Sequence, residues 1–206
     1  MHRLDAVQAL AKLVTDRDLF VCAHGGLRND WWNHRPGGVD NTCFLTGMDT
    51  VSATAFGLAV ALPHRRVVSL DTDGSQLMSV SLLATLGNEL PPNLTIVVFD
   101  NGRYESIGGL LTQTASRTDL ARMAEAAGCP HAVTVCDVDS FSRAAERLLN
   151  DNEYGYIVAK TEPKAAHQWP KDKQKTTDGI EEKYRFLRYV ERLEGMRIHH
   201  VVEIGG

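Results

Sequence analysis

Cysteine is scarce in this chain of 206 residues: it has four, and no two of them form a C-x-x-C pair. The histidines complete no zinc-binding pattern either, so we expect Cys22, Cys43, Cys129 and Cys136 to be free, buried thiols. Long hydrophobic runs are also missing. No apolar stretch approaches the ~20 residues that a membrane helix requires, so we expect no membrane-spanning segment.

An excess of positive charge is absent, because 22 Lys and Arg residues face 26 Asp and Glu residues, for a net charge of −4. We therefore expect no nucleic-acid partner. The first five residues begin an amphipathic helical pattern without the apolar core of a signal peptide, which predicts a cytoplasmic location. No G-x-G-x-x-G follows the first predicted strand, which argues against a Rossmann dinucleotide enzyme.

Short apolar runs alternate with helical patterns over most of the chain. This alternation predicts an α/β fold, a doubly wound, mostly parallel sheet with helices on both faces. The predicted strands are 18–23, 66–71, 94–100, 131–135 and 154–160. The predicted helices are 4–14, 50–62, 79–88, 119–127, 138–150 and 181–194. Residues 101–117 are predicted to form a long loop, a feature that often carries function.

The composition changes after residue 160. Lys and Thr dominate 161–178 together with Pro163 and Pro170, which indicates a loop or arm. We expect residues 1–160 to form one domain. We expect 161–206 to form a C-terminal arm and helix that pack on this domain or on a partner subunit. Residues 196–206 are compatible with an extra strand.

Two polar turns follow neighbouring predicted strands, twenty-eight positions apart: Asp73-Gly74-Ser75 and Asn101-Gly102. The helix between them makes a strand–helix–strand unit, which implies parallel strands. Both turns then lie at the carboxyl ends of adjacent strands, where open α/β sheets bind ligands. A carboxylate and an amide oxygen suit Mg²⁺, which completes its octahedron with phosphate oxygens and water.

Gly74 lets the backbone approach an anion closely and supplies a free amide at the start of a helix, where phosphates bind. These parts together fit a diphosphate that Mg²⁺ bridges to the protein. The alternative is that Asp73-Gly74 and Asn101-Gly102 are ordinary turn pairs, which are common in loops. Their spacing and their placement after strands favour the ligand site.

At these residues the sequence resembles the thiamine diphosphate enzymes, whose fingerprint is Gly-Asp-Gly, just under thirty residues, and Asn-Asn. Here the matching segments are Thr72-Asp73-Gly74 and Asp100-Asn101, so Thr stands for the first Gly and Asp for the first Asn. The resemblance implies thiamine diphosphate and Mg²⁺ as cofactors. It implies that the metal binds Asp73, Asn101 and the backbone carbonyl of Arg103.

The resemblance extends to other positions. Met48 matches the bulky residue that props the cofactor into its bent conformation, although Asp49 stands where the family usually has Gly. The cofactor-binding set that it implies is Met48, Thr72, Asp73, Gly74, Ser75, Asn101, Arg103 and Tyr104.

Residues 100–109, DNGRYESIGG, and 118–129, TDLARMAEAAGC, are similar to the sulfopyruvate decarboxylase β subunits and the C-terminal half of phosphonopyruvate decarboxylase. The chain departs from them at Glu105, Ile107 and Leu110. The resemblance implies a subunit of a 2-oxo acid decarboxylase, with a small 2-oxo acid as substrate.

A partner subunit is also implied. Enzymes of this family need a carboxylate beside the aminopyrimidine ring of the cofactor, and a separate pyrimidine-binding domain supplies it. This chain is too short to hold both domains. We therefore expect a second polypeptide that provides the activating Glu, in an assembly of α₂β₂ or larger.

His24 follows a predicted strand and precedes two glycines, so an imidazole there would be able to move a proton at neutral pH. The alternative is a structural histidine. Arg28 and Arg103 are candidates for meeting an anionic substrate group, because Arg forks suit carboxylate, phosphonate and sulfonate. The alternative for them is surface ion pairing.

Two other functions remain open. One is a ligase or synthase of the same cofactor class, which joins the intermediate to a second carbonyl compound. The other is a non-catalytic, regulatory cofactor-binding subunit. Thr72, Asp49 and Leu110 favour the second, whereas the intact Asp73 and Asn101 count against it.

Overall fold

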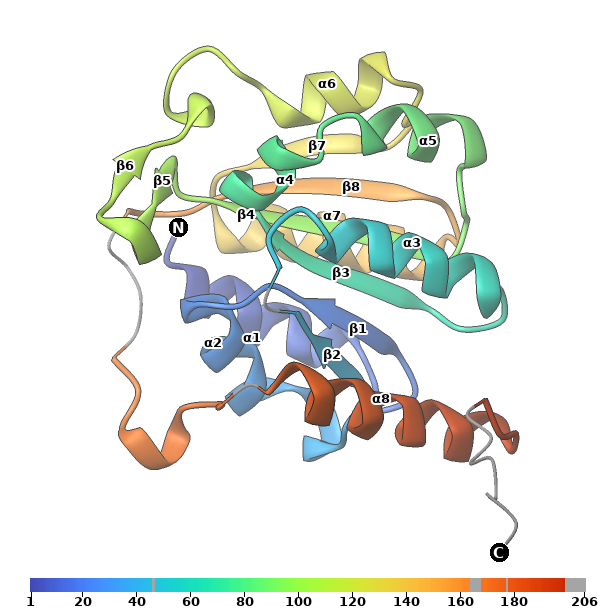
Figure 1. Cartoon of the computed structure of the whole chain (residues 1–206). Coiled ribbons are helices and arrows are strands. Elements are labelled where there is room, and N and C mark those ends of the chain that lie inside the picture. The colour runs from blue at the N-terminus through green and yellow to red at the C-terminus, as the bar shows by residue number, and fades with distance from the viewer. Residues whose placement is uncertain (46, 164–167, 177, 199–206) are drawn as a thin grey trace, which may run out of the picture.

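The computed structural model describes residues 1–45, 47–163, 168–176 and 178–198. Within them a parallel, six-stranded sheet has the order β2-β1-β3-β4-β8-β7 (Figure 1). Its strands are β1 Leu19–Cys22, β2 Thr42–Phe44, β3 Val67–Thr72, β4 Leu94–Asp100, β7 Ala132–Val135 and β8 Gly155–Lys160. A separate antiparallel hairpin pairs β5 Arg103–Tyr104 with β6 Leu110–Leu111.

The central strands are apolar because helices cover them on both faces. Every residue of β4 is buried. The β3–β4 register pairs Val67 with Leu94 and Thr72 with Phe99. Because the two strands run in the same direction, Asp73 and Asp100 leave the sheet at neighbouring points of one edge.

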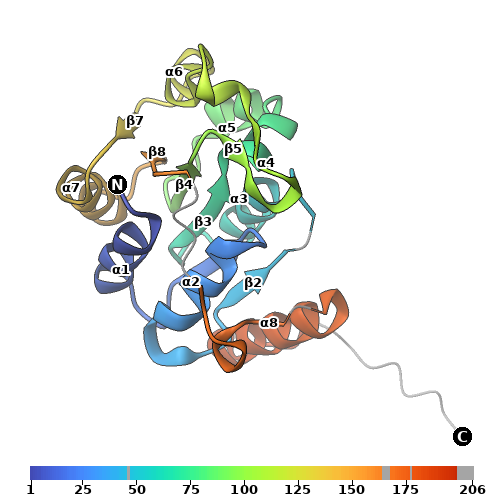
Figure 2. The same cartoon turned by 90° about the vertical axis from the view of Figure 1, so that its left-hand side faces the viewer.

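The helices form two layers, with α1, α2 and α7 on one face and α3 to α6 on the other (Figure 2). Contacts of α1 with α7 and of α3 with β1 and β3 hold these layers on the sheet. The bounds are α1 Arg3–Leu13, α2 Gly26–His34, α3 Val51–Ala61, α4 Asp73–Met78, α5 Leu82–Glu89, α6 Leu120–Ala126, α7 Val138–Asn150 and α8 Gly179–Glu194. The doubly wound parallel fold predicted from the sequence is confirmed.

Helix α8 lies along the edge strand β2. Asp178 caps its first turn by accepting hydrogen bonds from the amides of Ile180 and Glu181. Near its other end, Glu194 binds Arg65 through Nε at 2.6 Å, and the hydroxyl of Tyr189 donates to the carbonyl of Asp16. These contacts cover the edge of the sheet that β2 would otherwise expose.

The structure corrects several element predictions. The sequence pattern does not predict helix α2 or strand β2, because residues 26–44 carry no clear periodicity. Helix α4 begins at Asp73, before the helix predicted at 79–88, and the loop predicted at 101–117 contains the β5–β6 hairpin. No strand occupies residues 196–198, and the rest of the strand considered at 196–206 lies outside the described residues.

Three of the four cysteines are buried free thiols, as predicted, whereas Cys136 is exposed. It directly follows the last residue of β7, at the point where the chain turns toward α7. None of the helices in the described part of the chain combines the length and apolar character needed to cross a bilayer.

Candidate active site

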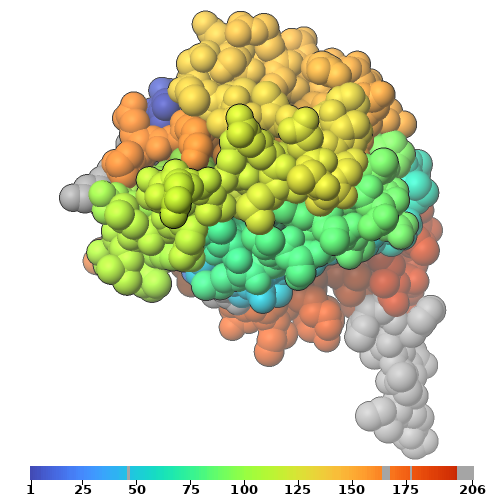
Figure 3. Space-filling view, turned by 90° about the horizontal axis from the view of Figure 1, so that it is seen from above, coloured from blue at the N-terminus to red at the C-terminus, as the bar shows by residue number. Residues whose placement is uncertain are grey.

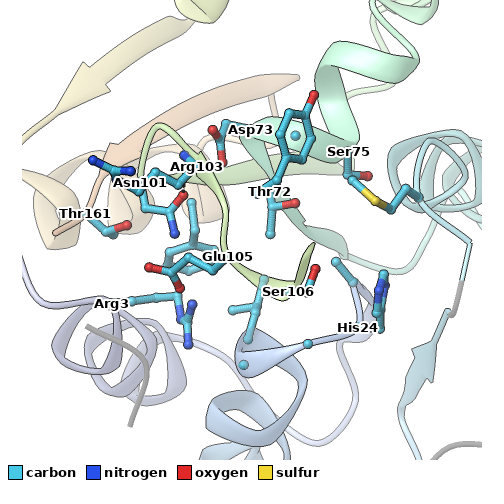
Figure 4. Close-up of a pocket in the computed structure, with 18 residues that line it drawn as sticks. Arg3, His24, Thr72, Asp73, Ser75, Asn101, Arg103, Glu105, Ser106 and Thr161 are labelled. Atoms are coloured by element: carbon cyan, nitrogen blue, oxygen red, sulfur yellow. Dashed lines mark hydrogen bonds between the residues drawn. The ribbon is translucent and has the colours of Figure 1, made fainter. Parts of the chain in front are cut away.

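A pocket opens at the carboxyl edge of the sheet, between the ends of β1, β3 and β4 and the β5–β6 hairpin (Figure 4). It encloses about 670 Å³, including its open mouth. All the predicted site residues except Arg28 line it: His24, Met48, Thr72, Asp73, Gly74, Ser75, Asn101, Arg103 and Tyr104. Glu105 and Ser106, from the loop predicted at 101–117, line it as well. The lining residues to which the sequence did not point are Arg3, Ala23, Gly25, Gly26, Leu27, Phe99 and Thr161.

Asp73 stands at the tip of β3, as the first residue of α4, and is 1% exposed. Its Oδ2 accepts a hydrogen bond of 2.6 Å from the hydroxyl of Thr112 and lies 3.1 Å from that of Thr114. Burial raises the pKa of this carboxyl, and the nearby Asp100 raises it further, against the hydrogen bond from Thr112.

Asp100 ends β4 beside Asp73 and is also buried. Its Oδ1 accepts from the hydroxyl of Thr114 at 2.8 Å and from the amide of Gly102 at 3.0 Å. Its Oδ2 pairs with Nζ of Lys160 at 2.5 Å. Lys160 thus neutralises the acidic residue that stands where the family fingerprint has an amide.

The cluster of Asp73, Thr112, Thr114 and Asp100 is short of hydrogens. Four oxygen–oxygen contacts of 2.6 to 3.1 Å join these side chains, but the two threonine hydroxyls supply only two hydrogens. With both carboxylates ionised, two of the contacts hold no hydrogen. A cation near Asp73 would offset the repulsion between these oxygens, so the donor set fits a bound metal ion.

Asn101 forms a tight turn at the tip of β4. Its Oδ1 accepts a hydrogen bond of 2.9 Å from the amide of Arg103, and Gly102 between them has a φ of +67°. The guanidinium of Arg103, the first residue of β5, donates to the carbonyl of Gly109 at 2.9 Å and so closes the turn before β6.

Gly74 is required by the close packing of Tyr104. A Cβ at position 74 would lie 2.5 Å from the ring of Tyr104 and 3.5 Å from Cε of Met48. Asp49 has a φ of +73°, the left-handed conformation in which Gly is favoured. Its amide donates to the hydroxyl of Ser75 at 3.1 Å, so the loop carrying Met48 is held on the start of α4.

His24 lies between β1 and α2 and lines the pocket, well apart from Asn101 in Figure 4. Arg28 is not among the residues that line it. The described residues hold no group of three or more His, Cys, Asp and Glu side chains suited to a metal. A metal at Asp73 would therefore depend on one carboxylate, amide or carbonyl oxygens, and oxygens of a bound ligand.

A parallel α/β sheet with Asp73, Asn101 and glycines gathered at its carboxyl edge defines a binding domain for a phosphate-bearing cofactor. The profile of the thiamine pyrophosphate enzymes, C-terminal TPP binding domain, matches residues 22–159. The chain belongs to this family. The resemblance to thiamine diphosphate enzymes stated from the sequence is confirmed.

The relatives include the "Sulfopyruvate decarboxylase subunit beta" of Methanocaldococcus jannaschii, 28% identical over 161 residues, which cover 78% of this chain and 84% of the relative. The protein of the same name from Methanothermobacter thermautotrophicus is 33% identical over 62% of this chain and 67% of its own. The "Phosphonopyruvate decarboxylase" of Streptomyces viridochromogenes is 46% identical over 48% of this chain and 25% of its own.

Solved structures share the fold. Benzoylformate decarboxylase from Polynucleobacter necessarius matches with a TM-score of 0.62 and 19% identity, over 77% of this chain and 33% of its own. The 4-hydroxybenzoylformate decarboxylase of Rhodococcus jostii matches with a TM-score of 0.65, also at 19% identity. This chain spans about a third of each of these two proteins.

Proposed function

We propose that this chain is the diphosphate- and Mg²⁺-binding subunit of a thiamine diphosphate-dependent 2-oxo acid decarboxylase, with a substrate similar to sulfopyruvate or phosphonopyruvate. One observation carries the proposal: in this chain, which belongs to the family, Asp73 and Asn101 line the same pocket, at the ends of two adjacent strands. Residues 1–160 would form the cofactor-binding domain and 161–206 the arm.

Asp73, the side chain of Asn101 and the carbonyl of Arg103 would hold the metal in this proposal. The hydrogen-poor contacts around Asp73 support a cation there. When bound, thiamine diphosphate supplies the electron sink that lets CO₂ leave a 2-oxo acid. The residues of the pocket would bind and orient the cofactor and the substrate.

The start of α4 supplies the diphosphate contacts, through Thr72, Gly74 and Ser75, because amides at a helix start attract phosphate. Met48 and Tyr104 pack over this turn and shape the floor for the cofactor ring. His24 lines the same pocket and would move a proton to or from the substrate.

A second subunit would complete the site. Ile107, Leu110 and Leu111 on the β5–β6 hairpin are 62 to 65% exposed, and this hairpin projects at one end of the molecule beside the pocket (Figures 1 and 3). An apolar surface at the rim of a pocket is typical of a protein interface. Two of the relatives are named as β subunits. We propose a pyrimidine-domain partner that supplies the activating Glu, in an α₂β₂ or larger assembly.

The test is to purify the chain alone and together with its co-purifying partner, and to measure thiamine diphosphate binding by calorimetry with and without Mg²⁺. CO₂ release from sulfopyruvate and phosphonopyruvate is measured in the same samples. We expect tight, Mg²⁺-dependent binding and turnover only with the partner present. Tight binding with full turnover by the chain alone would contradict the two-subunit proposal.

The same assay separates the two other functions. CO₂ release that depends on an added acceptor aldehyde would indicate a carboligase. Retained cofactor affinity with no turnover in the complete assembly would indicate a regulatory subunit.

A further inference from the structure

A buried arginine stands in the pocket wall far in sequence from the metal residues. Arg3, in the first turn of α1, has a side chain that is 10% exposed, and it lines the pocket. Its Nε donates to Oδ2 of Asp30 at 2.8 Å, and the Asp30 side chain is 1% exposed. A buried cation in a pocket wall is costly unless it is paired or binds a ligand.

The pairing with Asp30 uses little of the hydrogen-bonding capacity of Arg3. Nη2 lies 2.8 Å from the same carboxylate oxygen that Nε binds but forms no hydrogen bond in the described part of the chain. A guanidinium has five N–H donors. The two N–H groups of Nη2 are buried in the pocket wall without an acceptor among the described residues.

The guanidinium of Arg3 fits in the pocket wall because residue 26 is a glycine. A Cβ at Gly26 would lie 2.5 Å from Nη2 of Arg3, so a larger residue at the start of α2 would displace the arginine. Gly26 lines the pocket as well. The guanidinium of Arg3 and Gly26 therefore pack against each other in the pocket wall, between α1 and α2.

The C-terminal arm holds the other oxygen of the counter-ion. Nε1 of Trp169 donates to Oδ1 of Asp30 at 2.8 Å. The amide of Lys175 donates to Oδ1 of Asn29, which anchors the arm on the same helix. Asp30 is thereby fixed from two sides, and it fixes Arg3 in turn.

Arg3 and Asp73 lie at opposite ends of the site in Figure 4, with Arg3 beside Glu105 and Asp73 beside Thr72. A diphosphate held at Asp73 and at the start of α4 is therefore placed away from Arg3. The guanidinium is left for a different anionic group.

We propose that Arg3 binds the second anionic group of the substrate, a phosphonate or sulfonate on a short 2-oxo acid, and that Asp30 and Trp169 position it. The inference rests on the function proposed above. A guanidinium fork matches the oxygens of either tetrahedral group. Arg3 would thus distinguish such substrates from a 2-oxo acid that has no second charge.

The main test uses the double variant Arg3→Gln with Asp30→Asn in the complex with the partner subunit. Removing both charges avoids the buried, unpaired carboxylate that Arg3→Gln alone would leave. We expect kcat/KM to fall about 100-fold for 3-phosphonopyruvate and 3-sulfopyruvate, through KM, and less than about threefold for pyruvate. The phosphonate and sulfonate arms of the assay decide which anion is preferred.

A binding measurement complements the kinetics. The unreactive analogue 3-phosphonopropionate should bind the wild-type complex in calorimetry and lose about 100-fold in affinity in the double variant. Arg3→Lys, which keeps the charge without the fork, should lose about tenfold. Arg122→Gln is the matched control, because the Arg122 side chain is 84% exposed on α6.

The positioning role of the arm is tested with Trp169→Phe, which keeps an aromatic side chain and removes the N–H donor to Asp30. We expect a KM about threefold higher for the two doubly charged substrates, with kcat unchanged and with the KM for pyruvate unchanged. A variant that was merely less stable would not separate the substrates in this way.

Two results would overturn the assignment of Arg3: equal losses for pyruvate and for the doubly charged substrates, or a loss of thiamine diphosphate affinity in the double variant. The second would place Arg3 in the cofactor site. If the wild-type complex releases CO₂ from none of the three acids, the proposed function fails, and the calorimetry with 3-phosphonopropionate still decides whether Arg3 binds a phosphonate.

Discussion

The end of β3 carries two buried aspartates, Asp71 and Asp73, that differ in what surrounds them. Asp71 is fully buried, and it accepts hydrogen bonds from the hydroxyl of Ser52, the side-chain amide of Gln76 and the backbone amide of Thr72, at 2.9 to 3.0 Å. The hydroxyl of Tyr156 donates to Oε1 of Gln76 and extends this network into the core. Asp71 is therefore saturated by donors of the protein itself.

Asp73 has the same chemistry and nearly the same burial, but it faces the pocket and depends on the hydroxyls of Thr112 and Thr114, the second of which also donates to Asp100. Burial raises the pKa of both Asp71 and Asp73, so burial alone does not tell them apart. The difference lies in the donors. A carboxylate whose acceptor sites are filled within the core stabilises the fold, whereas one that shares its donors and faces a pocket is able to bind a ligand.

The largest expected effect follows from removing the unsaturated carboxylate. Asp73→Ala should lower the Mg²⁺-dependent affinity for thiamine diphosphate by about 1,000-fold or more, because a metal ligand of this kind contributes several kcal/mol. The fold should remain, since Asp73 lies at the edge of the sheet. Calorimetry gives the affinity and circular dichroism the fold, and an unchanged affinity would remove the metal assignment.

The saturated carboxylate should behave in the opposite way. Asp71→Ala removes the buried acceptor that Ser52, Gln76 and the amide of Thr72 share, and it should lower the free energy of unfolding by about 3 kcal/mol. The Mg²⁺ affinity of the folded fraction should change little. Urea unfolding together with Mg²⁺ titration tests the contrast, and it would not stand if Asp71→Ala lost metal affinity as strongly as Asp73→Ala.

The sequence predicts one of these regions better than the other. The runs ending at Thr72 and Asp100 are local and apolar, so the strands and the turns at Asp73 and Asn101 are evident without a structure. Thr112, Thr114 and Lys160 reach the same cluster from distant positions, and no local pattern connects them. Arg3 is hidden in another way, because a basic residue in an amphipathic helix is expected to face water. Its burial depends on α2, whose polar aromatic sequence carries no clear period.

A third buried carboxylate, Asp100, extends the comparison, because the charge of Lys160 compensates its own charge. Lys160→Met leaves Asp100 buried without its cation and should lower the free energy of unfolding by about 2 kcal/mol. Adding Asp100→Asn, which restores the amide of the family fingerprint, should recover most of that loss. Urea unfolding of the single and double variants measures the coupling, and a double variant no more stable than Lys160→Met would show that the pair is not charge compensation.

The smallest expected effect concerns Glu194 on α8, whose pKa is lowered, whereas the pKa values of Asp71 and Asp73 are raised. The hydrogen bond from Arg65 lowers the pKa of Glu194, with help from His64. A carboxyl whose pKa is lower in the folded chain stabilises it above the unfolded pKa, and this stability is lost as the pH falls through the folded pKa. The ordinary value of 4.5 sets the upper edge of that window.

Glu194→Gln should therefore be less stable than the wild type by about 0.5 kcal/mol at pH 7, and the difference should vanish in the acid range below that window. Urea unfolding at several pH values measures this difference, with Glu181→Gln as the control, because the Glu181 side chain is 65% exposed near the other end of α8. A difference that stayed constant with pH would mean that Glu194 holds α8 through packing of its side chain rather than through its charge. In that case α8 would stay packed on β2 at low pH, whereas a contact that depends on the Arg65–Glu194 ion pair would weaken when Glu194 is protonated.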